Sequence, residues 1–153
     1  MALYSLSSQE KLDSVHQDLV LIFQEVIKVF DNTILYGYRS PEEQFELFKK
    51  GRNNIAGHWI ITNKKEVVTF KDGYIAKSKH NFSPSLAIDV TPYPIDWNDI
   101  KRIHYFAGWI MATAERLKQE GKITNKITWG GDWNRNTQVK DETFMDLCHF
   151  EIK

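Results

Sequence analysis

The spacing of apolar residues predicts two long amphipathic helices. In the first, Ser7 and Glu10 form a capping box ahead of apolar residues that recur every three or four positions between Leu12 and Phe30. In the second, a stripe of the same period runs through residues 98–119 and is followed by a glycine suited to a helix end.

A third, shorter helix is marked by its ends. Ser40 is placed as the N-cap, Pro41 occupies the first helical position and Glu43 completes a capping box. Gly51 follows at the expected end of this helix.

Short alternating, β-branched or aromatic runs predict strands between these helices. The runs cover residues 33–37, 66–70, 85–91, 126–129 and 148–152. Most of the segment 53–79 is irregular and contains glycine, and Pro92 and Pro94 end the third strand. Helices and strands are mixed without a regular βαβ alternation, so an α+β fold is expected.

Composition indicates one globular domain over residues 1–153. The chain is 42% hydrophobic and 26% charged, which argues against disorder. Lys+Arg and Asp+Glu both number 20, so no net charge favours nucleic acid or an acidic membrane. The longest apolar run, residues 19–23, is far too short to span a bilayer. We expect no nucleic-acid or membrane partner, and we expect the protein to be a monomer.

The N-terminus and the cysteine content indicate a cytosolic origin. The first residues lack the basic and apolar regions of a secretory signal. A single cysteine, Cys148, excludes an internal disulfide framework. The protein is therefore expected to be made, and to fold, in a cytosol.

His80, Asp89 and His149 are the candidate chemical groups. Two imidazoles and one carboxylate are the protein ligands of an open catalytic zinc site. His80 lies in a polar loop and Asp89 inside an apolar strand, where a buried carboxylate is costly unless it is paired. From pattern alone the alternative stays open that Asp89 faces solvent and both histidines are ordinary polar residues.

Three separated motifs resemble, in the same order, those of the M15 zinc peptidases, which include D-alanyl-D-alanine peptidases and phage endolysins. They are Gly37-Tyr38-Arg39-Ser40 with Gln44, Ser78-Lys79-His80 with Ala87-Ile88-Asp89, and Trp129-Gly130-Gly131-Asp132-Trp133 with Asp146-Leu147-Cys148-His149. The resemblance covers most of the chain. It implies the fold of hedgehog proteins and D-alanyl-D-alanine peptidases, a short, mostly antiparallel sheet packed against about three helices.

The resemblance also implies roles for individual residues. His80, Asp89 and His149 would bind one zinc ion, and Asp146 would be the catalytic acid and base. Arg39 would stabilise the developing oxyanion with planar, permanently charged donors. A metal-activated water then needs only one group to accept its proton and pass it on.

At other positions of the motifs the sequence leaves alternative roles open. Ser78 is expected to contact substrate, and so are Trp129 and Asp132, although these two equally suit a structural turn that packs against the site. Gln44 could brace the Arg39 turn or contact substrate.

Glu151 competes with Asp146 for the role of base. It lies two residues beyond His149 and therefore on the same strand face. The family position favours Asp146, with Glu151 as a partner that orients a ligand or the substrate.

The sequence departs from the family pattern at two places. The loop between His80 and Asp89 is longer than usual, and we expect it to affect substrate preference. Cys148 stands where the family usually has proline, but strand alternation points it away from His149.

The function implied is that of a phage endolysin, a zinc-dependent endopeptidase that cuts the L-alanyl-D-glutamate bond of the peptidoglycan stem peptide. Such an enzyme would wait in the host cytoplasm and reach the wall when the membrane is permeabilised during lysis. Two alternatives remain: a D,D-carboxypeptidase or D-alanyl-D-alanine dipeptidase with the same metal chemistry, and a non-catalytic domain that binds wall fragments.

Overall fold

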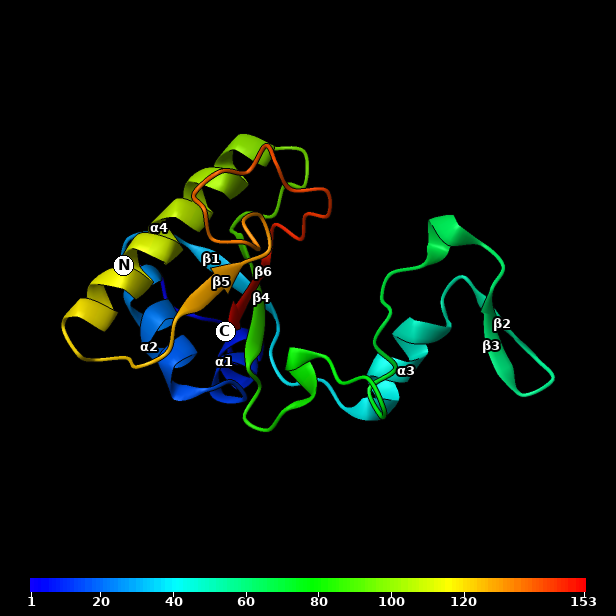
Figure 1. Cartoon of the computed structure of the whole chain (residues 1–153). Coiled ribbons are helices and arrows are strands. Elements are labelled where there is room, and N and C mark those ends of the chain that lie inside the picture. The colour runs from blue at the N-terminus through cyan, green and yellow to red at the C-terminus, as the bar shows by residue number, and fades with distance from the viewer.

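A four-stranded antiparallel sheet forms the centre of the molecule. The computed structural model describes all residues, 1–153. The strands follow the order β1 (Asn32–Tyr36), β4 (Ala87–Pro92), β6 (His149–Ile152) and β5 (Ile127–Trp129), and each neighbouring pair is antiparallel (Figure 1). Four of the five predicted strands are therefore confirmed, with ends that differ by one or two residues.

Three helices lie on one side of this sheet (Figure 1): α1 (Leu6–Asp13), α2 (Gln17–Val26) and α4 (Ile100–Gln119). The hydrophobic core fills the space between them and the sheet, with Phe23 of α2 packing edge-on against Phe150 of β6. The α+β architecture with a mostly antiparallel sheet is confirmed. None of the helices combines the length and the apolar character that crossing a membrane requires.

The first predicted helix is wrong as a continuous element, because α1 and α2 are separate. Between them the chain leaves the helical path and pairs with a distant segment: Ser85 donates to the Ser14 carbonyl, and the His16 amide donates to the Ser85 carbonyl. His16 then caps α2 by accepting from the amide of Asp18 through Nδ1. A non-local backbone pairing thus overrides a continuous helical pattern.

The helix caps are partly as predicted. Ser40 and Glu43 form the full capping box of the third predicted helix. At the start of α1, however, the N-cap is Ser5, whose side chain accepts from the Ser8 amide, and Ser7 lies inside the helix.

The remaining elements form a lobe that extends from the opposite side of the sheet (Figure 1). It contains α3 (Pro41–Lys49), a hairpin of β2 (Arg52–Ile55) and β3 (His58–Ile61), and the short 3₁₀ turn η1 (Lys64–Glu66). The hairpin was not predicted, although its turn has a local signal. Ala56 and Gly57 have positive φ values of 52° and 85°, the type I′ geometry that glycine favours.

The strand predicted at residues 66–70 does not form, because this segment has no strand partner. A side chain of α3 bonds instead to the side chain of Thr69 and to the carbonyl of Lys71 just beyond the segment, as described below. The central sheet brings residues of the functional site together. Asp89 of β4 pairs with Tyr36 of β1 on one side and with His149 of β6 on the other.

Candidate metal centre

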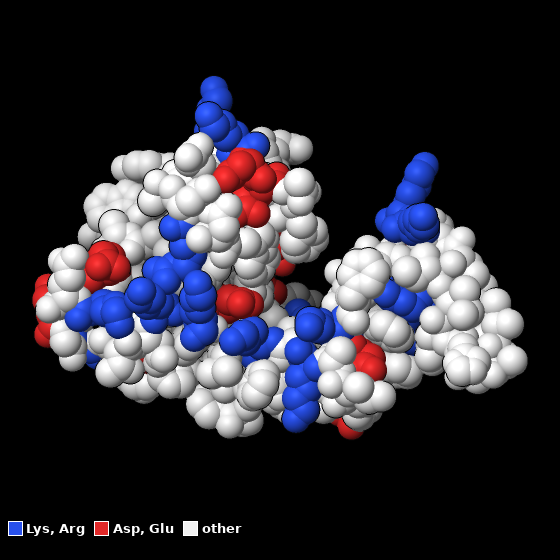
Figure 2. Space-filling view, viewed as in Figure 1, with Lys and Arg blue, Asp and Glu red and all other residues white.

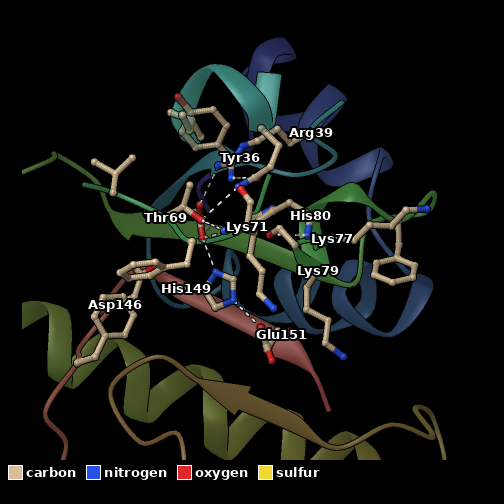
Figure 3. Close-up of a pocket in the computed structure, with 18 of the residues that line it drawn as sticks. Tyr36, Arg39, Thr69, Lys71, Lys77, Lys79, His80, Asp146, His149 and Glu151 are labelled. Atoms are coloured by element: carbon tan, nitrogen blue, oxygen red, sulfur yellow. Dashed lines mark hydrogen bonds and ion pairs between the residues drawn. The ribbon is translucent and has the colours of Figure 1, made fainter. Parts of the chain in front are cut away.

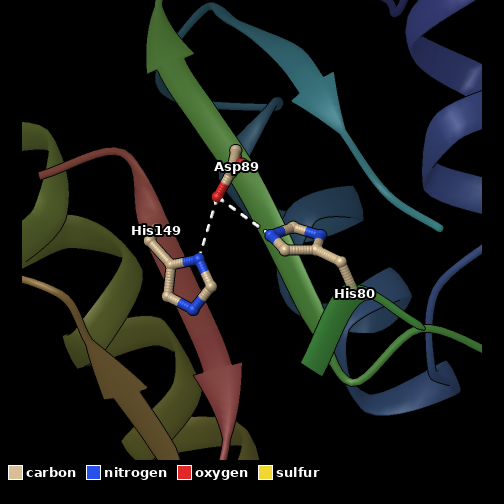
Figure 4. Close-up of side chains that lie close together, drawn as sticks. All are labelled: His80, Asp89 and His149. Carbon is tan, nitrogen blue, oxygen red and sulfur yellow. Dashed lines mark hydrogen bonds and ion pairs between the residues drawn. The ribbon is translucent and has the colours of Figure 1, made fainter. Parts of the chain in front are cut away.

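His80, Asp89 and His149 converge on one point above the sheet (Figure 4). Asp89 and His149 are cross-strand partners, and His80 comes from the 3₁₀ turn η2 (Lys79–Asn81). Oδ1 of Asp89 lies 3.3 Å from Nε2 of His80 and 3.0 Å from Nδ1 of His149. One ligand atom from each residue lies within 4.8 Å of the others, and all three residues are buried. The alternative that Asp89 faces solvent is therefore wrong.

The outer nitrogen of each histidine is already engaged. Nδ1 of His80 donates to the carbonyl of Gly37 at 2.7 Å, and Nε2 of His149 lies 2.9 Å from Oε2 of Glu151. A carbonyl can only accept, so Nδ1 of His80 carries a proton and Nε2 is the nitrogen of this ring that would bind a metal. Partners of this kind fix ring orientation and tautomer in metal sites.

Gly37 is required for this arrangement. A Cβ at this position would lie 2.3 Å from both the Lys11 carbonyl oxygen and Oγ of Ser14, far closer than non-bonded atoms approach. Glycine therefore lets the start of the Arg39 turn pack against α1 while its carbonyl faces His80.

The turn that carries His80 is tied to the Arg39 segment. The side chain of Ser78 caps η2 by accepting from the His80 amide, and its own amide donates to Oδ1 of Asn81. Asn81 donates through Nδ2 to the Arg39 carbonyl at 2.9 Å, and the Arg39 amide donates to the His80 carbonyl at 2.9 Å. Ser78 does line the pocket, but its hydroxyl is used to hold a ligand turn.

Arg39 points into the same site. Its Nη1 donates to Oε1 of Gln44 at 3.0 Å, and its Nη2 lies 3.8 Å from Oδ2 of Asp89. The guanidinium also stacks over the Tyr36 ring, 4.9 Å from the centroid. The guanidinium thus has contacts with three different elements, α3, β4 and β1.

Gln44 links Arg39 to the lobe. It is 1% exposed, and its amide nitrogen donates to Oγ1 of Thr69 at 3.3 Å and to the carbonyl of Lys71 at 3.0 Å. Gln44 therefore braces the Arg39 turn, one of the two roles left open from sequence, and it holds the segment that was expected to be a strand.

Charges in the site shift three pKa values. Burial alone would raise the pKa of Asp89, but hydrogen bonds to His149 and His80 hold it well below its ordinary range. Burial alone would lower the pKa of His149, but its contacts with Asp89 and Glu151 raise it to about 9. Burial and the negative charge of Asp89 raise the pKa of Asp146.

Asp146 lines the pocket at the end of a constrained turn. Its amide donates to the carbonyl of Gly130 at 2.8 Å, and a Cβ on Gly130 would lie 2.1 Å from the Asp146 carbonyl oxygen. Cys148 donates through Sγ to Oδ1 of Asp146 at 3.4 Å and is not part of the metal cluster.

Trp129 and Asp132 do not line the pocket. Trp129 is 7% exposed, and its indole donates to the carbonyl of Leu147. The carboxylate of Asp132 accepts from the amides of Asn136 and Thr137. The predicted substrate contacts are corrected in favour of the packing-turn alternative, because both polar groups are satisfied within the fold.

The pocket itself lies between the ligand face of the sheet and the lobe (Figure 3), with a volume of about 800 Å³. Several of its residues lie outside the motifs, namely Tyr36, Thr69, Lys71 and Lys77, and two others, Lys79 and Trp133, stand in motifs that gave them no role. The ring of Trp133 lies 5.6 Å from that of His149. Most of the others are supplied by irregular chain, where pattern gives no signal.

Comparisons with known proteins agree with this geometry. The sequence pattern of a family described as phage L-alanyl-D-glutamate peptidase matches residues 2–153. The peptidoglycan L-alanyl-D-glutamate endopeptidase CwlK of Bacillus subtilis is 32% identical over 125 residues, which are 82% of this chain and 62% of that relative. The chain thus spans less than two thirds of the length of this relative.

A solved structure shares the fold. The crystal structure of the L-Ala D-Glu endopeptidase ChiX of Serratia marcescens matches with a TM-score of 0.64 at 21% sequence identity. The match covers 98% of this chain and 89% of the other, so the sheet, its helices and the lobe together correspond to a known architecture.

Proposed function

The chain belongs to the phage L-alanyl-D-glutamate peptidase family, and on that premise we propose that it is a zinc-dependent endopeptidase that hydrolyses the L-alanyl-D-glutamate bond of the peptidoglycan stem peptide. The observation that carries this proposal is the convergence of His80, Asp89 and His149 at one wall of the pocket. The name of the B. subtilis relative, a peptidoglycan endopeptidase, supports the choice of substrate.

The donor set fits zinc. Two imidazoles and one carboxylate with engaged outer nitrogens are typical of a catalytic zinc site that leaves a position open. When bound, zinc would supply Lewis acidity that polarises the scissile carbonyl and makes water a nucleophile near neutral pH.

The chain's own residues would move the proton and hold the charge. Asp146, whose pKa is raised, is suited to accept the proton of the attacking water and to return it to the leaving amine. Arg39 would donate hydrogen bonds to the oxyanion, from a guanidinium already aimed at the site by Gln44. Glu151 would orient His149 through Nε2 and leave the base role to Asp146.

The biological setting we propose is lysis of a phage-infected bacterium. The enzyme would accumulate in the host cytoplasm and cut the wall after the membrane is permeabilised, in keeping with the phage family to which the chain belongs. It would act as a monomer, since all three ligands and both catalytic residues come from one chain.

Digestion of peptidoglycan, with products read by mass spectrometry, tests the proposal. New L-alanine C-termini and D-glutamate N-termini are expected, and a chelator should abolish them until zinc is restored. His80→Ala should be inactive, whereas His58→Ala, at an exposed histidine of β3, should match the wild type. Release of D-alanine alone, or of D-alanyl-D-alanine, would reject the endopeptidase for the corresponding D,D-peptidase. Binding without products would indicate a wall-binding domain.

A further inference from the structure

The pocket is lined by several lysines that have no carboxylate partner. Lys50, Lys71, Lys77 and Lys79 all line it, and none of them lies within 4.0 Å of an acidic oxygen. The lysines that do form ion pairs are outside the pocket: Lys28, Lys49 and Lys122. In the view of Figure 2, basic side chains gather beneath the hollow between the main body and the lobe.

The acidic residues of the pocket do not balance these lysines. Asp89 is committed to two histidines and Arg39, and Glu151 to the outer nitrogen of His149. Asp146 accepts from Cys148. With a divalent cation bound, the pocket would carry a net positive charge and favour an anionic substrate.

The backbone of Lys71 is held by hydrogen bonds to other residues of the pocket. Its carbonyl accepts from the buried amide of Gln44, and its own amide donates to Oγ1 of Thr69 at 3.1 Å. The same Gln44 side chain accepts from Arg39. A single buried group therefore sets the position of Lys71 relative to the oxyanion arginine.

Lys79 is fixed by the ligand turn. It immediately precedes His80 in η2, is half-buried, and its carbonyl accepts from the Leu86 amide at 3.0 Å. Figure 3 shows the side chains of Lys71 and Lys79 on the side of the cluster where Glu151 lies. By comparison, Lys77 has its ammonium over the Phe82 ring, 5.9 Å from the centroid.

The proposed substrate offers a matching group next to the scissile bond. In the stem peptide D-glutamate continues the chain through its γ-carboxyl, so its α-carboxylate is free and lies on the residue whose amine is released. Ammonium groups that line the same pocket as the metal ligands suit such a carboxylate, and a charge-assisted hydrogen bond is stronger than a neutral one.

Resting on the proposed function, we propose that Lys71 and Lys79 bind this α-carboxylate and make the enzyme selective for stem peptides in which it is free. A peptide with a carboxamide at this position loses the opposite charge and turns an N–H donor toward the lysines. Each lost charged contact corresponds to a decrease of about ten-fold in kcat/KM.

The test uses two muropeptides that differ only in this group, a free α-carboxylate or a carboxamide. The zinc-loaded wild type should prefer the free carboxylate by about ten-fold or more. Lys71→Gln and Lys79→Gln should each reduce kcat/KM for the carboxylate peptide far more than for the amide, so that the preference shrinks. Lys71→Arg should retain much of it, and Lys101→Gln, an exposed position of α4, should match the wild type.

The outcomes separate this inference from the proposed function. Equal rates on both peptides in the wild type would overturn the lysine assignment and leave the endopeptidase intact. Equal losses on both peptides in the lysine variants would also overturn it, because they would reveal a structural role. No cleavage of the L-alanyl-D-glutamate bond in either peptide would overturn the proposed function, and this inference with it.

Discussion

For Glu151, the geometry favours one of the two roles that the sequence left open, catalytic base or partner of a ligand. Its carboxylate lies 2.9 Å from the outer nitrogen of His149, on the same strand face as the ligand itself. A carboxylate in this position makes imidazole a more basic ligand and holds its ring in place. We therefore assign Glu151 to orienting the metal ligand His149 and not to the role of catalytic base.

Glu151→Gln should weaken zinc affinity by about 10- to 100-fold, because an amide is a poorer partner for the ligand histidine. Titration against a competing chelator measures this change, and Glu115→Gln on the exposed face of α4 is a matched control. At saturating zinc the variant should keep most of its turnover. Unchanged affinity with abolished turnover would instead make Glu151 the base.

His149 gives the metal-free protein a characteristic pH response. Because contacts with Asp89 and Glu151 raise its pKa to about 9, the ring is protonated at neutral pH and must lose a proton to bind metal. Zinc affinity should therefore increase with pH up to about 9. Calorimetry in two buffers of different ionisation enthalpy should show proton release at neutral pH, and identical heats would contradict the assignment.

The residues of the site differ in how far sequence could predict them. Motifs indicated the three ligands, Asp146 and Arg39, and the structure brings all five to one pocket. Spacing in the sequence alone could not predict that these residues meet, because the pairing of Asp89 with His149 depends on the register of two strands that are far apart in the chain. Lys71 lies outside every motif, and Trp133 stands in a motif that gave it no role, since irregular backbone places both residues.

At the scale of elements, the turn that follows β5 is tightly packed. Gly130 and Gly131 both lie where a Cβ would clash, the first with the Asp146 backbone and the second with the Trp129 ring. The Trp-Gly-Gly-Asp motif therefore serves close packing, which places Asp146 beside the ligands.

Gly130→Ala should displace this turn, because the added Cβ would meet the Asp146 carbonyl oxygen at 2.1 Å. We expect a loss of about 1–3 kcal/mol in the free energy of unfolding and a larger loss in turnover than in zinc affinity. Urea denaturation and steady-state kinetics measure both.

The control for this substitution is Gly108→Ala, where a Cβ on α4 meets nothing within 4 Å. It should leave activity unchanged and raise stability by up to about 1 kcal/mol. If Gly130→Ala behaved in the same way, the turn would not position the base.

The elements that sequence misassigned share a physical cause. The break between α1 and α2 depends on backbone pairing with Ser85, and the failed strand at residues 66–70 depends on a side chain of α3. Local pattern contains neither interaction. The capping box of α3 and the apolar stripe of α4 are local, and both were predictable.

At the scale of the molecule, a sheet backed by helices (Figure 1) presents the ligands, and residues of the lobe line the other side of the pocket. Hydrophobic periodicity predicted the α+β class and the helices that form the core. It could not predict the lobe, which lacks a large buried core of its own and is joined to the site through polar contacts such as those of Gln44.

The most direct test of the whole account is a zinc titration of the metal-free enzyme, with cleavage of a defined muropeptide followed by mass spectrometry. We predict that the rate increases linearly, stops increasing at one zinc per chain, and that the L-alanyl-D-glutamate bond is the one cut. Asp89→Ala should show no such increase. Full activity without metal, or cleavage at a different bond, would contradict the account.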